Sequence, residues 1–525
     1  MNARRGGALR SGTVTFAGIA IGALATLALA QVVGRGLGPA GTGLFFQAVA
    51  LFAIVSNGLQ LGADTALVRT LSRHIALHEQ DRLRSTVRSA LLPVIGVSLL
   101  VSLAVFSCAA PIGAWITPSD PDYATELVRV MSPFLGAGAL LTVVLGGTRG
   151  IGSTLPYTAL QNLALPLSRL AVVAIGTIAG AGVQWIAAGW AAVLAPLVAI
   201  AALVLAGQLR SVSAPSSSTP SGSHSGTARL FWGFALPRGA STLIERALDW
   251  SGMLVVLAVG GPVVGGIYAI VNRCVNAGTM IDQAARIVVG PRISRALAVG
   301  DSDEAARLFL EVTRALVLVA WPFYLLLAVF APAILSIFGP AFAAGALPLA
   351  IIALAMMLAT TAGMVQSILL MGGRSSWQLG NRVVQLTVLL VVTALLVPRL
   401  GLLGAAIGQA ASIAVDTVLA ATQVAVKMRI RSSARLIALP AALAVVVIAG
   451  GGSVAAALFG RTLATFLIAS IVLLVIYAIT VLLLRGPLGL GALALRGGSS
   501  DPLPAPSPTP TPSPAVPDGA VALER

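Results

Sequence analysis

Long apolar stretches recur along this chain, and they constrain its fold more than any other feature. A helix needs about 20 apolar residues to cross the roughly 30 Å hydrocarbon core of a bilayer. Of the 525 residues, 57% are hydrophobic and 10% are charged, and the mean hydropathy is +0.96. Because lipid offers no hydrogen-bond partners, the spanning backbone must pair internally, as a helix does. We therefore predict an all-α polytopic membrane protein.

Turn residues and charges divide the apolar sequence into about fourteen predicted transmembrane helices. Their expected ranges are 13–33, 43–68, 89–116, 124–148, 156–179, 184–208, 231–259, 264–289, 312–338, 344–371, 376–397, 402–426, 436–459 and 462–484. The first range is too long for a cleaved secretory signal, so we expect it to remain as a span.

Basic residues are concentrated in alternate connectors, which predicts the sidedness of the chain. Lys and Arg favour cytoplasmic connectors. If the N-terminus is cytoplasmic, the inner connectors contain Arg69, Arg73, Arg82, Arg84, Arg88, Arg292, Arg295, Arg307, Lys427, Arg429, Arg431 and Arg435. We expect both termini to be cytoplasmic, in a bacterial cytoplasmic membrane. The net charge of +16 then points to anionic lipid headgroups and not to nucleic acid.

The sequence repeats itself at an offset of 223 residues. An even number of spans per repeat gives two parallel six-helix bundles with a central cavity between them. The expected organisation is an N-terminal bundle (1–210), a flexible cytoplasmic linker (211–228), a C-terminal bundle (229–431), two further spans (432–485) and a Pro-rich disordered tail (486–525). The aligned pairs are Gly38-Pro39 with Gly261-Pro262, Gln60 with Gln283, Arg69 with Arg292, and Arg84 with Arg307.

Polar side chains form stripes inside two of the predicted spans. Ionisable and polar groups at membrane depth usually face a protein interior or a water-filled cavity. Helical spacing places Asn272, Asn276, Thr279 and Gln283 on one face of the eighth span, and Ser56 and Gln60 are the repeat partners of the last two. Two interpretations stay open: both stripes line one cavity between the halves, or they bind helices together.

Charged residues also lie deep in the predicted spans. Arg246, Arg273, Arg169 and Arg382 are candidates for binding an anionic substrate group, because guanidinium presents paired donors to phosphate oxygens. Each could equally belong to a structural ion pair. Glu245, Asp249 and Asp416 either bind a coupling H⁺ or Na⁺ or neutralise these arginines.

The first ninety residues resemble the polysaccharide transporter family of the multidrug, oligosaccharidyl-lipid and polysaccharide exporter superfamily. The resemblance rests on the turn from Val33 to Phe45, which reads VGRGLGPAGTGLF, and on the segment from Gly62 to Arg69, which reads GADTALVR. It implies twelve to fourteen helices, alternating access, and a cationic central cavity that receives the glycan-diphosphate headgroup of an undecaprenyl-linked substrate. Arg246 and Arg273 are the best matches to that cavity.

Three other functions remain alternatives to a lipid-linked glycan flippase. A cation-coupled multidrug exporter of the same superfamily predicts twelve spans and carboxylate-dominated binding. A membrane-embedded glycosyltransferase, polymerase or ligase needs a large external loop, and the outer connectors here are short. A non-transporting scaffold for envelope assembly is the third. We predict no enzymatic activity, catalytic residue, metal or cofactor; the expected partners are the glycan substrate and membrane lipids, with glycan polymerases or glycosyltransferases as candidates.

Overall fold

Helices account for all the regular secondary structure in the described part of the chain. The computed structural model describes residues 2–116, 121–212, 224–298, 301–371, 375–427 and 434–488. Twelve helical segments within these ranges are long and apolar enough to cross a membrane. Two of them, Gly18–Ala76 and Arg229–Gln283, contain 59 and 55 residues, and each supplies two spans because about 20 residues suffice for one. About fourteen spans and the all-α polytopic fold are thus confirmed.

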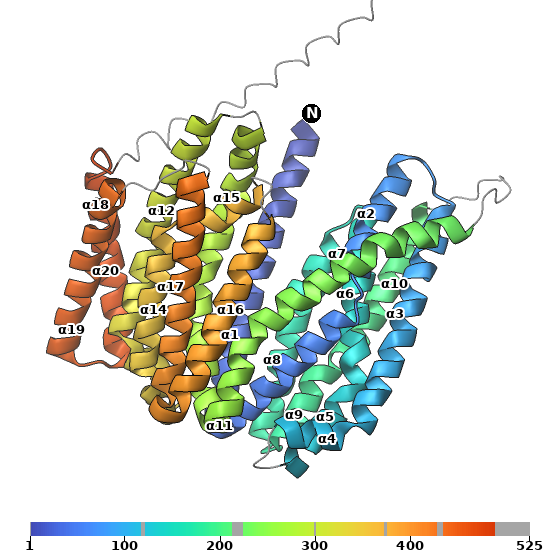
Figure 1. Cartoon of the computed structure of the whole chain (residues 1–525), viewed down its shortest axis with the longest axis horizontal. Coiled ribbons are helices and arrows are strands. Elements are labelled where there is room, and N and C mark those ends of the chain that lie inside the picture. The colour runs from blue at the N-terminus through green and yellow to red at the C-terminus, as the bar shows by residue number, and fades with distance from the viewer. Residues whose placement is uncertain are drawn as a thin grey trace, which may run out of the picture. The chain divides into compact units, whose positions relative to one another are not determined.

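The first six spans form the N-terminal bundle (Figure 1). Short helices break several of its spans, and the π-helical turn η2 stands directly before the helix that contains Pro166, where the missing N–H interrupts regular pairing. The bundle consists of α1 (Asn2–Gly58), α2 (Ala63–Ala76), α3 (Arg82–Ser107), α4 (Ala109–Ile116), α5 (Pro121–Met131), η1 (Ser132–Phe134), α6 (Leu135–Gly150), α7 (Leu155–Tyr157), η2 (Thr158–Ala164), α8 (Leu165–Ile178), α9 (Val183–Ala192) and α10 (Leu194–Val212).

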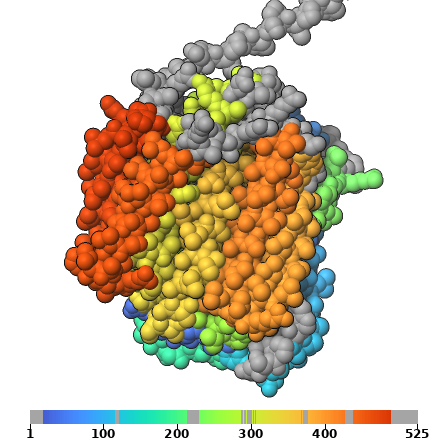
Figure 2. Space-filling model, turned by 60° about the vertical axis from the view of Figure 1, so that its left-hand side comes forward, coloured from blue at the N-terminus to red at the C-terminus, as the bar shows by residue number. Residues whose placement is uncertain are grey.

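The next six spans form the C-terminal bundle. Its helices α14, α16 and α17, coloured yellow to orange, lie side by side in Figure 2, with α17 packed against both of the others. The bundle consists of α11 (His224–Ala298), α12 (Ser302–Val329), α13 (Ala331–Ser336), η3 (Pro340–Gly345), α14 (Ala346–Thr361), α15 (Val365–Met371), α16 (Ser375–Leu400) and α17 (Leu402–Lys427).

Two further spans follow the C-terminal bundle. They are formed by α18 (Ala434–Ala444), η4 (Val445–Gly450), α19 (Gly451–Phe459) and α20 (Leu463–Leu483), and α18 packs against α12. Residues Met1–Tyr477 make one compact unit, and Ala478–Arg525 make a second. Most of the predicted linker and tail lies outside the described residues, so those boundaries stay predictions.

The two longest helices cross at their Gly-Pro turns. Gly38 in α1 and Gly261 in α11 have positive φ angles, 64° and 77°, and extended ψ angles, so each helix reverses direction there. Both turns carry the same conformation at the repeat offset of 223 residues. Beyond each turn, Gly43 packs on the carbonyl of Pro262 and Gly266 packs on the carbonyl of Pro39. These reciprocal contacts are what two copies of one unit produce when they pair face to face.

Candidate functional site

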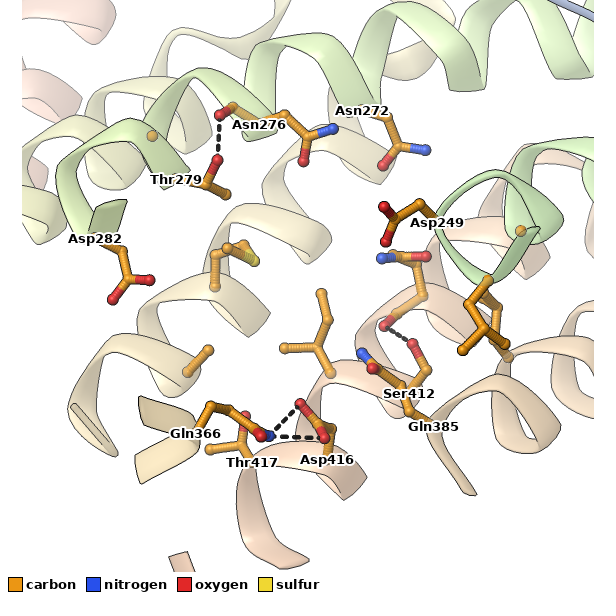
Figure 3. Close-up of a pocket in the computed structure, with 18 of the residues that line it drawn as sticks. Asp249, Asn272, Asn276, Thr279, Asp282, Gln366, Gln385, Ser412, Asp416 and Thr417 are labelled. Atoms are coloured by element: carbon orange, nitrogen blue, oxygen red, sulfur yellow. Dashed lines mark hydrogen bonds between the residues drawn. The ribbon is translucent and has the colours of Figure 1, made fainter. Parts of the chain in front are cut away.

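A polar cavity of about 780 Å³ lies inside the C-terminal bundle. Its lining comes from α11, α12, α14, α15, α16 and α17, and within the described residues only Phe46 of α1 joins them from the N-terminal bundle. Figure 3 shows polar side chains from several helices directed toward the same space. The sequence predicted a cavity between the halves, and the structure instead places this space within one half.

The predicted stripe of the eighth span forms one wall of this cavity. Asn272, Asn276, Thr279 and Gln283 all belong to the lining. Figure 3 shows the first three in succession along α11, followed by Asp282. Helical spacing of four and three residues is the reason why they share a face. The cavity interpretation therefore fits this stripe.

The opposite wall contains polar residues that sequence reasoning missed. Gln366 of α15 donates from Nε2 to both carboxylate oxygens of Asp416, at 2.9 and 3.0 Å, and Tyr268 donates to Gln409 at 3.0 Å. Ser412 also lines the wall. Gln409, Ser412 and Asp416 follow one another at steps of three and four residues on α17, a periodicity that could have revealed this face.

The cavity is electrically balanced. Its lining contains three arginines and three aspartates, so their formal charges cancel: Arg246, Arg273, Arg382, Asp249, Asp282 and Asp416. Arg246 lies 3.6 Å from Asp249, and the guanidinium of Arg273 stacks over Phe46 at 4.2 Å. The resemblance implied a cationic cavity, and the carboxylates on the lining remove the net positive charge.

Four predicted site residues lie away from this cavity. Ser56 packs against Gly138 of α6, a contact between two helices of the N-terminal bundle, whereas Gln60 donates to Asn57, three residues earlier in its own segment, at 3.3 Å. Arg169 donates to the carbonyl of Trp190 at 3.3 Å and stacks over its ring at 3.5 Å, as in a cation–π contact. Glu245 is exposed and lies 4.0 Å from Arg238.

Residues 8–297 match a protein family described as polysaccharide biosynthesis protein. The chain belongs to this family. The match spans the N-terminal bundle and nearly all of α11, which supplies the polar stripe of the cavity. It confirms the resemblance that the Gly-Pro turn and its neighbours suggested. No curated protein matches the chain at a significant level.

Solved structures share the fold of this polysaccharide biosynthesis protein at low sequence identity. The lipid II flippase MurJ, in an inward closed conformation, aligns with a TM-score of 0.66 and 11% identity, over 90% of this chain and 98% of that one. A multidrug resistance MATE family transporter of the MOP superfamily, inward-facing, aligns at 0.57 and 16%, over 78% and 94%. A MOP superfamily transporter from Pyrococcus furiosus aligns at 0.50 and 17%, over 80% and 95%.

Proposed function

We propose that this protein is a flippase that moves lipid-linked oligosaccharides or polysaccharide precursors, such as undecaprenyl-diphosphate glycans, across the bacterial cytoplasmic membrane by alternating access. The observation that carries the proposal is the polar cavity at membrane depth in a polysaccharide biosynthesis protein. Pockets of about 300–1,000 Å³ enclose ligands of drug size, so a cavity of about 780 Å³ suits a headgroup of a few sugars.

The chemistry of the lining fits sugars. Amides and hydroxyls both donate and accept hydrogen bonds, which matches the hydroxyl groups of a glycan. Such side chains from several helices line the cavity, among them Asn272, Asn276, Thr279, Gln385 and Ser412. The protein needs no catalytic group for this task, because flipping breaks no bond.

Two carboxylates are the candidates for ion coupling. Asp249 and Asp416 line the cavity on α11 and α17, where binding of H⁺ or Na⁺ would change the charge balance that the arginines set. Glu245 is the weaker candidate because it is exposed, pairs with Arg238 and is absent from the cavity lining. In this proposal both termini are cytoplasmic, and glycan polymerases or glycosyltransferases act beside the flippase.

Reconstitution tests the proposal directly. Proteoliposomes are loaded with a fluorescent undecaprenyl-diphosphate glycan, and the fraction reaching the opposite leaflet is followed with a membrane-impermeant quencher. We expect Thr279→Val to weaken transport about two- to tenfold, because one hydrogen bond contributes about 0.5–1.5 kcal/mol. Thr387→Val on α16, whose hydroxyl bonds only its own helix at the carbonyl of Val383, is the matched control. Movement equal to that in empty liposomes would refute the function.

A multidrug exporter is the second candidate, favoured by the likeness to a MATE transporter and by the three cavity carboxylates. The same proteoliposomes decide between the two. Accumulation of a lipophilic cationic dye, without movement of the glycan, would establish export of drugs instead.

A further inference from the structure

One side chain of the C-terminal bundle reaches into the N-terminal bundle beside the crossing of α1 and α11. The guanidinium carbon of Arg273, on α11, lies 4.2 Å from the centre of the Phe46 ring, on α1. Phe46 stands three residues after Gly43, which places both on one face of α1. Arg273 likewise stands seven residues after Gly266 and shares its face of α11. The contact therefore belongs to the same interface as the two crossing glycines.

The Phe46 ring is suited to hold a cation. The face of an aromatic ring carries partial negative charge, and it attracts a guanidinium more strongly where water is excluded. Phe46 is 1% exposed, and it also lines the cavity. None of the ion pairs between described residues includes Arg273. Its charge is therefore stabilised in large part by a ring that belongs to the other bundle.

Further aromatic rings fix the position of Phe46. The ring centres of Phe46 and Phe45 lie 5.2 Å apart, with an interplanar angle of 75°. Phe45 meets Trp190 of α9 in the same edge-on manner, at 6.4 Å and 84°, and Arg169 stacks over Trp190. Edge-to-face pairs are favourable arrangements of aromatic rings. This row of rings anchors Phe46 to the N-terminal bundle, so the ring cannot follow Arg273 when the bundles move apart.

The internal repeat contains this contact only once. At the offset of 223 residues, Phe46 corresponds to Ala269 and Arg273 corresponds to Ala50. Both alanines are buried, and a methyl group has neither a charge nor a π face. The Gly-Pro turns and the glycine packing, by contrast, are reciprocal between the halves. Backbone packing therefore accounts for the crossing, and the contact of Arg273 with Phe46 needs a role of its own.

We propose that Phe46 is a positioning residue, which holds Arg273 over its ring and thereby ties the charge of the cavity to the spacing of the two bundles. The inference rests on the proposed function, because alternating access requires the bundles to move relative to each other. Arg273 shares the cavity lining with two other arginines and three aspartates. When the bundles separate beside the crossing, the guanidinium loses the ring and becomes free to pair with a cavity carboxylate; when they close, the ring takes it back.

Fluorinated phenylalanines at position 46 test the contact without removing the ring. One, two or three fluorine atoms withdraw electrons from the π face stepwise, yet they make the ring more apolar and change its size little. We expect the unfolding temperature in detergent micelles to fall at each step, because the ring attracts the guanidinium less. In the matched series with Arg273→Gln, fluorination should not lower it. A ring that only fills space would keep or raise the unfolding temperature, and that result would overturn the proposal.

Spin labels test whether the contact depends on the spacing of the bundles. Labels at Ala181, between α8 and α9, and at Leu400, at the end of α16, report the distance between the bundles on the predicted outer side. Trifluorophenylalanine at position 46 should increase the ratio of separated to closed molecules about two- to thirtyfold, the range expected for loss of a cation–π contact. The control is the same replacement of Phe52, whose ring meets Trp190 edge-on at 5.5 Å.

The two readouts separate this proposal from the proposed function. An unchanged distance distribution with trifluorophenylalanine at position 46, or an equal change with the replacement at Phe52, would overturn the proposal even if the unfolding temperature falls. Absence of flipping by the wild type would refute the function alone, since neither the unfolding series nor the spin-label distance requires transport.

Discussion

The crossing of α1 and α11 leaves no room for a side chain, and this makes a sharp test of the fold. A Cβ at position 266 would overlap the carbonyl oxygen of Pro39 and would lie 2.8 Å from the backbone nitrogen of Gly43. A Cβ at position 43 would overlap the carbonyl oxygen of Pro262. Backbone atoms cannot rotate aside as a flexible side chain can, so the two helices must separate.

The size of the effect follows from two opposing contributions. Forcing extra volume into a packed site costs about 1–3 kcal/mol, and contact with backbone places Gly266→Ala near the upper end. Replacing glycine by alanine inside a helix returns up to about 1 kcal/mol. We therefore expect Gly43→Ala and Gly266→Ala each to destabilise the protein by about 2 kcal/mol. Because the first substitution already separates the helices, the double variant should cost less than the two single costs together.

Unfolding in detergent micelles, followed by circular dichroism, measures this cost. The matched control is Gly96→Ala in α3, because a Cβ there meets nothing within 4 Å. The control should unfold at the wild-type temperature or slightly above it, and both crossing variants well below it. If Gly266→Ala behaves like Gly96→Ala, or if the double variant is fully additive, the helices do not cross as described.

Three further predictions concern other parts of the chain. Arg169→Ala should destabilise the protein by about 2 kcal/mol in thermal unfolding, through loss of the Trp190 contact, and leave glycan binding unchanged. His74 forms a hydrogen bond with the Glu79 carboxylate at 2.6 Å, and this bond lowers the pKa of Glu79 from its ordinary value of 4.5. The bond therefore stabilises the folded protein above pH 4.5, and this stabilisation is lost as the pH falls further and the carboxyl becomes protonated. The unfolding midpoints of wild type and Glu79→Gln should converge below pH 4.5. Thr462→Cys, in a background without the native cysteines, should react with an impermeant maleimide from outside the cell only.

The sequence was sufficient to predict the helical architecture because the bilayer restricts the backbone conformations that can cross it. Apolar stretches of about 20 residues must be helices, and the structure confirms about fourteen of them. The Gly-Pro pairs at Gly38 and Gly261 were visible as an internal repeat, and both adopt the reversing conformation. The chain therefore crosses the membrane twice within α1 and α2 and twice within α11, as the turn residues predicted.

The site was harder to read from sequence, since a stripe of polar residues shows only that one helix face is polar. Thr279 and Gln283 line the cavity, whereas their repeat partner Ser56 packs against Gly138 of the N-terminal bundle and Gln60 bonds to Asn57 in its own segment. At these two positions the repeat did not predict the surroundings. Gln366 was overlooked because its partner, Asp416, lies fifty residues away on another helix.

Local hydropathy and repeated turns were enough to establish the lipid environment of this protein, its helical spans and the parallel relation of its halves. Only the tertiary structure shows which half contains the cavity, that three arginines and three aspartates share its lining, and that the beginning of α11 packs against the N-terminal bundle. Those properties depend on how helices far apart in sequence pack together, and the pattern of one helix does not specify its neighbour.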